Sequence, residues 1–168
     1  MNRRRGAGLA LVAVVAVFAV VAAPVSAATV RAREPSCSLL RGSEVERVLG
    51  SPVMRTLPAD SPVGASLCYW TVDGSGDARF VAVYLARGDK DEMRRGYAMA
   101  RATYRGAARE RVTGLGKRAF YAVPIGAVYM LREGRLVYVQ NLDGRGTEDP
   151  VAIREQAVEL AGLVADRL

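Results

Sequence analysis

The sequence predicts an α+β fold: an antiparallel sheet of about five to seven strands, with three helices packed mainly on one face. Three observations predict it. Runs of β-favouring residues lie between turn signals, three other segments repeat apolar residues with the helical period, and several strands in succession separate one helix from the next. Strands grouped in this way favour an antiparallel sheet. The order helix, three strands, helix, three or four strands, helix also suggests a duplicated unit of one helix and three strands.

The first predicted helix covers residues 39–49. Ser43 and Glu46 form the Ser-x-x-Glu pattern of a helix start, and Gly50 is typical of a helix end. One face of this helix carries its apolar residues, which are Val45, Val48 and Leu49.

Three strands are expected next. Residues 53–57 form a short strand before a Pro-rich loop that begins at Pro58. Residues 66–72 favour a pleated surface, and residues 80–85 read as a strand buried on both faces. The turn-forming residues 73–77 join these two strands into a hairpin.

The second predicted helix covers residues 89–105. Asp89 and Glu92 can cap its start, and Gly106 ends it. Its apolar residues recur at helical spacing and make one stripe: Met93, Tyr97, Ala100 and Tyr104.

Four further strands are expected at residues 109–112, 119–123, 128–132 and 136–140. The last two form the clearest hairpin in the chain. The Gly-rich stretch 114–117 lacks the longer loop of a phosphate-binding P-loop and leads into a strand, so we interpret it as a tight turn. The third helix then begins at Asp149, with Pro150 at its first helical position.

The N-terminal residues 1–28 are typical of a secretory signal peptide. Arg residues at 3–5 precede an unbroken run of fifteen small and apolar residues. Cleavage fits equally well after Ala27 and after Ala28. The apolar run is shorter than the roughly 20 residues that span a bilayer, although an uncleaved membrane anchor stays the alternative.

The remaining chain is expected to form one exported domain. Residues 29–36 are short, charged and Pro-containing, which predicts a disordered leader, and residues 37–168 form a single secreted α+β domain. In an oxidising compartment the only two cysteines, Cys37 and Cys68, are expected to pair in a disulfide. A pair of reactive thiols is the alternative, but the chain has neither His nor a Cys-x-x-Cys spacing to activate them.

Composition removes several kinds of chemistry. The chain has no His, which excludes His-ligated metal sites and His-based acid–base catalysis, and two Cys are too few for a Cys-only zinc site. We therefore expect no metal, no cofactor and no catalytic residue. The signal segment carries three of the 24 basic residues and none of the 17 acidic ones, so its removal lowers the net charge from +7 to +4.

Basic residues gather in one part of the chain. Between residues 94 and 118 there are eight of them and a single acid, Glu110. On a helix, Arg94, Arg101 and Arg105 fall within about 40° of one another. With Arg109, they are the candidate site for an anionic polymer, a lipid head group or an acidic protein. The alternative is a solvated face whose Arg stems cover apolar surface.

Several short motifs carry a family resemblance over residues 37–140. They are Cys37-Ser38-Leu39-Leu40, Glu44-Val45, Leu49-Gly50, Cys68-Tyr69-Trp70, Val112-Thr113-Gly114-Leu115-Gly116 and Ala119-Phe120-Tyr121. With them the chain resembles an actinobacterial family of secreted or lipoprotein-like domains of unknown function, and more weakly the extracellular sensor domains of receptors. Lys117 stands where that pattern has an acid. The resemblance implies an exported domain; because the lipid-bearing Cys of many members is missing, it implies free secretion into the extracellular or cell-wall space.

Together these features predict a secreted, non-catalytic binding domain whose partner is extracellular or part of the cell envelope. Nucleic acid is not expected as a partner, because the compartment is wrong for it. Two alternatives stay open: a small secreted hydrolase that uses paired carboxylates, and an inhibitor-like module that docks on another protein through its sheet.

Overall fold

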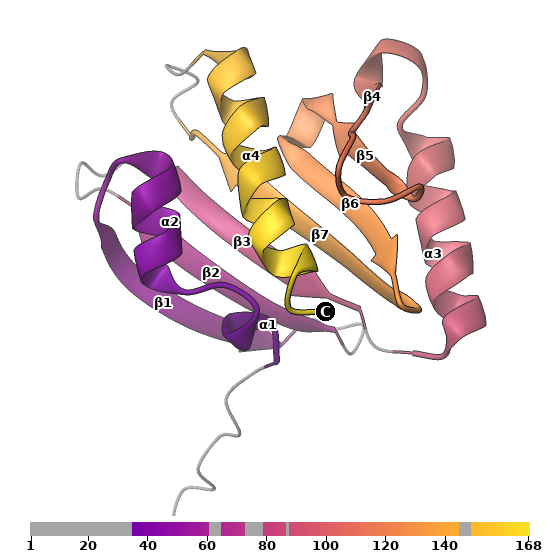
Figure 1. Ribbon diagram of the computed structural model, residues 1–168, viewed down its shortest axis with the longest axis horizontal. Coiled ribbons are helices and arrows are strands. Elements are labelled where there is room, and N and C mark those ends of the chain that lie inside the picture. Colours follow the sequence, from indigo (N-terminus) through magenta and orange to yellow (C-terminus); the bar gives the residue numbers. More distant parts are fainter. Residues whose placement is uncertain (1–34, 61–64, 73–78, 87, 145–148) are drawn as a thin grey trace, which may run out of the picture. The chain divides into compact units, whose positions relative to one another are not determined.

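The computed structural model describes residues 35–60, 65–72, 79–86, 88–144 and 149–168, and these residues form a seven-stranded antiparallel sheet (Figure 1). Its strands run in the order β1-β2-β3-β7-β6-β5-β4. Their bounds are β1 Val53–Asp60, β2 Ser66–Val72, β3 Arg79–Leu85, β4 Arg109–Arg111, β5 Ala119–Ala122, β6 Ala127–Arg132 and β7 Arg135–Leu142. The predicted fold class is confirmed.

The helices of the described residues cover the two faces unequally. They are α1 Pro35–Ser38, α2 Gly42–Leu49, α3 Lys90–Thr103 and α4 Pro150–Ala165, with short 3₁₀ turns η1 Gly106–Ala108 and η2 Val123–Ile125. α1, α2 and α4 share one face, and Figure 1 shows α2 and α4 in front of the strands. α3 packs against the other face. Within the described part of the chain, no helix has the length and apolarity needed to cross a membrane.

Alternation along the strands builds a separate core on each face. Val128 and Val139 lie opposite each other on β6 and β7, and both belong to the main core with Leu160 of α4. Neighbouring residues of a strand point to the opposite face. There Phe120 of β5 forms a second core with Tyr97 of α3.

The suggested duplication holds for the strands and not for the helices. β1-β2-β3 and β5-β6-β7 are two meanders that meet at the antiparallel β3–β7 pair, and β4 extends the second one. A two-fold axis that relates them stands perpendicular to the sheet, so it would place both preceding helices on the same face. α2 and α3 lie on opposite faces, and α4 covers β6 and β7 on the face where a symmetric α3 would lie.

The start of α2 differs from the prediction. A carboxylate oxygen of Glu44 accepts a hydrogen bond from the backbone N–H of Arg41 at 2.8 Å, just before the helix. Glu46 instead accepts one from the backbone N–H of Val53 at 2.9 Å, which joins the helix to β1. The predicted cap by Ser43 and Glu46 is therefore wrong. The helix begins at Gly42, one residue before Ser43, and the Glu46 carboxylate binds the backbone of β1 and not the helix start.

Two other boundaries also differ. β1 continues through Pro58, where a loop is predicted; an edge strand has a neighbour on one side only and tolerates Pro. Pro35 and Ser36, predicted as the end of a disordered leader, belong to α1, and Ser36 is buried. The predicted signal peptide 1–28, the rest of the leader and the turn 73–77 lie outside the described residues.

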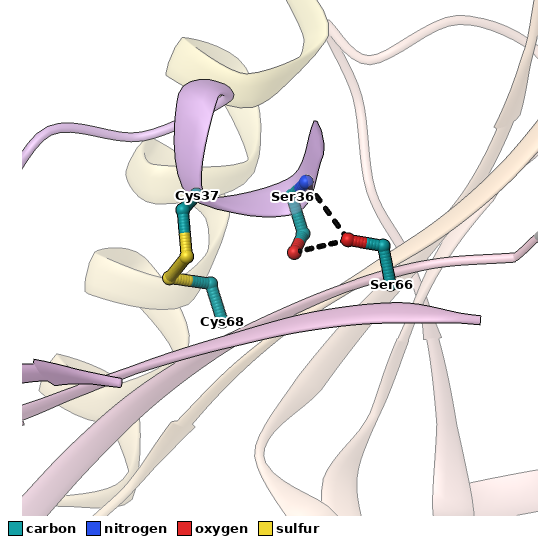
Figure 2. The surroundings of a disulfide bond; sticks show 4 residues. All are labelled: Ser36, Cys37, Ser66 and Cys68. Atoms are coloured by element: carbon teal, nitrogen blue, oxygen red, sulfur yellow. Dashed lines mark hydrogen bonds between the residues drawn. A yellow bond between two sulfur atoms is a disulfide. The ribbon is translucent and has the colours of Figure 1, made fainter. Parts of the chain in front are cut away.

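The predicted disulfide is confirmed and fastens α1 to β2. Cys37 and Cys68 are joined with Sγ atoms 2.01 Å apart. Beside the bond, Figure 2 shows a second link, in which the backbone N–H of Ser36 donates to Oγ of Ser66 at 3.1 Å and the two hydroxyl oxygens lie 2.7 Å apart. Both serines are buried, so each satisfies a polar group of the other away from water.

Candidate anion-binding site

The candidate site is a hollow of about 680 Å³ between α3, the segment that precedes β5, and β6, which we call the basic hollow. The four predicted arginines, Arg94, Arg101, Arg105 and Arg109, all line it. Lys117 and Arg118 complete its charged lining, and none of the described lining residues is acidic. The structure thus brings together side chains that are spread over 25 residues of sequence.

The start and the buried side of α3 decide which side chains face the hollow. As predicted, the Asp89 carboxylate accepts hydrogen bonds from the backbone N–H groups of Asp91 and Glu92, both at 2.8 Å. Tyr97 is buried against the sheet. Gly96 allows this close approach, because a β-carbon there would lie 2.9 Å from a methyl group of Leu136.

The end of α3 orients two of the arginines. Nε of Arg105 donates to the carbonyl oxygen of Ala102 at 2.7 Å, and a terminal guanidinium nitrogen of Arg109 donates to that of Arg101 at 2.9 Å. The last carbonyl groups of a helix lack partners within it and carry partial negative charge, so both contacts are favourable. Arg105 and Arg109 therefore have a structural role besides lining the hollow. α3 ends at Thr103, two residues before the predicted end.

The loop between β4 and β5 places the cations of the opposite wall. Val112 and Leu115 are buried and hold this loop against the main core. Gly116 has a φ of 93°, a conformation that favours glycine, just before Lys117 and Arg118. As expected, residues 114–117 lead into a strand and not into a helix, and the loop brings two cations to face α3.

The charges of the basic hollow are weakly compensated. Arg94 lies 3.2 Å from Asp91, in a pair exposed enough to contribute little. Among the described residues, no ion pair engages Arg101, Lys117 or Arg118. Crowded like charges repel one another, so binding an anion there relieves repulsion.

The pKa of Tyr97 shows that several of these cations lie close to its hydroxyl group. Burial raises the pKa of its hydroxyl, while the positive charges of Arg101, Arg109 and Arg118 oppose that rise. Three guanidinium groups from three different segments therefore act on one phenol, and that phenol stays a neutral hydrogen-bonding group at physiological pH.

A row of aromatic rings crosses the α3 face of the sheet and ends beneath the hollow. Tyr84 and Tyr138 stack with ring centroids 4.7 Å apart, and Tyr129 and Phe120 stack at 5.1 Å. These distances match the spacing between strands, so the rings stand upright on the sheet and present their edges outward. Burial raises the pKa of Tyr138 to about 12 and also raises that of Tyr129, so these two side chains are uncharged at physiological pH.

This row is not evident from the sequence alone. Its members come from β3, β5, β6 and β7, and only the order and register of the strands reveal that they are neighbours. The signal in the sequence is that each of those strands carries at least one aromatic residue.

Comparisons with protein-family models, with curated proteins and with solved structures gave no significant match for this chain. In the part of the chain that the structure describes, no three Cys, Asp or Glu side chains gather as a metal site would require.

Proposed function

We propose that this chain is a secreted, non-catalytic domain, stapled by its disulfide, that binds an anionic extracellular or envelope partner through the basic hollow. The observation that carries the proposal is the convergence of six cations, with no described acid among them, on one concave surface. The N-terminal signal pattern and the resemblance to exported actinobacterial domains support its extracellular setting.

The concave shape matters as much as the charge. Cations on facing walls add their fields at the centre of a hollow, where the low-dielectric walls screen them less than bulk water does. A merely solvated row of arginines would direct its charges outward from one helix. Here Lys117 and Arg118 lie on a different segment from Arg101 and face the same space.

A charge-reversal experiment tests this function. We expect the variant Arg94→Glu/Arg101→Glu/Arg118→Glu to lose retention on a heparin column, because these side chains line the hollow from both walls. The matched control is Arg55→Glu/Arg95→Glu/Arg135→Glu, which changes net charge equally at exposed positions outside the hollow.

Circular dichroism and the melting temperature should show that both variants fold. The control should elute close to the unmodified protein. Equal loss of retention in both variants would show that net charge alone causes retention, and would contradict a site in the hollow.

Export is tested separately. Mass spectrometry of the culture supernatant should find a chain that begins at Ala28 or Thr29, the two residues that follow the expected cleavage positions. Its mass should correspond to an oxidised Cys37–Cys68 pair. A chain that keeps residues 1–28 and stays with the membrane fraction would instead show an N-terminal anchor.

A further inference from the structure

The basic hollow continues at both ends. A second hollow of about 620 Å³ shares Arg94, Lys117 and Arg118 with it and reaches Lys90 and Arg132. A third, of about 630 Å³, shares Arg101, Arg109 and Lys117 with it and reaches Arg111. Because they share lining residues, the three hollows form one continuous groove, which we call the basic groove.

The basic groove is elongated. It follows α3 from Lys90, the first residue of the helix, beyond Arg101 in its last turn. With a rise of 1.5 Å per residue, the distance along the helix between these two residues is about 16 Å. Cations line both walls over this length. The two acids that also line it lie at its ends, and one of them, Glu110, is already paired with Arg154 at 2.5 Å.

The dimensions decide between partner classes. A flat membrane surface would meet the rims of the groove and not both of its walls. An extended acidic peptide points successive side chains to opposite sides, so each wall would meet a carboxylate only about every 7 Å. A chain of phosphate groups presents charged oxygens to both walls at every unit.

On the basis of the function proposed above, we propose that the ligand of the basic groove is a linear, phosphate-rich polyanion that lies lengthwise along α3. Guanidinium groups suit it, because their planar forks bind phosphate oxygens in pairs. The neutral Tyr97 supplies a polar but uncharged part of the lining between the cations.

Chain length provides the test. Binding of the full-length protein to orthophosphate, tripolyphosphate and long-chain polyphosphate should be measured by titration calorimetry at several salt concentrations. We expect affinity to rise with chain length until the groove is filled. For the long chain, six phosphate contacts predict a slope of about −4 in a plot of log K against log salt concentration, at about 0.7 per contact.

Variants at one end of the groove test whether the ligand lies along it. Lys90→Gln/Arg132→Gln should weaken long-chain binding about tenfold and change tripolyphosphate binding less than about twofold, because only the long chain reaches that end. The control Arg95→Gln, on the same helix but outside the groove, should change neither.

The outcomes separate this inference from the proposed function. Equal affinity for long and short phosphate chains, equal or tighter binding of polyglutamate, or binding only to vesicles of anionic lipid would each overturn the linear phosphate ligand. In those cases the heparin experiment would still show anion binding by the hollow. If the charge-reversal variant of the hollow is still retained on heparin, the proposed function itself is overturned.

Discussion

Glu44 and Arg167 join the start of α2 to the end of the chain. Two guanidinium nitrogens of Arg167 donate to the two carboxylate oxygens of Glu44 at 2.7 and 2.5 Å, and Arg167 also donates to the carbonyl oxygen of Leu39 at 2.9 Å. The hydrogen bonds and charge of Arg167 lower the pKa of Glu44 from 4.5 to about 2. The ionised carboxylate is therefore the form that stabilises the fold.

This pair gives a pH-dependent prediction. Glu44→Gln should lower the free energy of unfolding by about 1.5–3 kcal/mol at pH 7, the range for hydrogen bonds to charged groups. Because the folded-state pKa is depressed, the stabilisation is fully present above about pH 4.5 and is lost as the pH falls toward 2. The difference between the two proteins should therefore shrink over that interval, as measured by urea unfolding at a series of pH values.

The exposed pair Arg47–Glu159 serves as its control. Their side chains lie 2.8 Å apart but are 57% and 51% exposed, against 29% and 19% for Arg167 and Glu44. Glu159→Gln should cost less than about 1 kcal/mol. A pH-independent effect of Glu44→Gln would show that packing and not charge accounts for its contribution.

At the scale of elements, the disulfide closes a loop that contains all of α2 and β1. Replacing both cysteines, Cys37→Ala/Cys68→Ala, should lower the free energy of unfolding by about 3–4 kcal/mol in the chain-entropy model. Guanidinium unfolding of the variant, and of the unmodified protein with and without reductant, would measure it. If reduction changes the unfolding midpoint and the double variant does not, the effect belongs to the thiols and not to the cross-link.

Elements defined by local chemistry were predictable from the sequence. The Asp89 and Asp149 caps fix the starts of α3 and α4, and the hairpin of β6 and β7 follows from its alternation and turn. The face that α3 covers was not predictable in the same way. It depends on which strands adjoin β7, and that order is set by contacts distant in sequence. The extension of β1 through Pro58 likewise depends on its place at the sheet edge.

The candidate site likewise has one part that the sequence predicts and one part that only the structure reveals. Helical periodicity alone places Arg94 and Arg101 on one side of α3, whereas Arg105, predicted on the same side, lies just beyond the end of the helix. That Lys117 and Arg118 face them from another segment follows only from the packing of α3 against β6 and β7. The sequence therefore predicts one charged wall, and the structure adds the second.

Across the whole described part of the molecule, the two faces of the sheet differ in how far their charges are paired. On the α4 side, ion pairs link elements: Glu44 with Arg167 and Arg47 with Glu159. On the α3 side, the cations of the basic groove outnumber the acids. Salt should therefore weaken ligand binding on the α3 side while the less exposed pair of Glu44 and Arg167 is screened less.

The Cys37–Cys68 bond also sets a route for mechanical force. A pull applied through the N-terminal segment enters at α1 and passes covalently into β2, one place from the edge of the sheet. The segment between the cysteines carries no tension while the bond is intact. The two cysteines are 31 residues apart in sequence, which corresponds to about 100–110 Å of extended chain. Under load, this length becomes available for extension only after the disulfide is reduced.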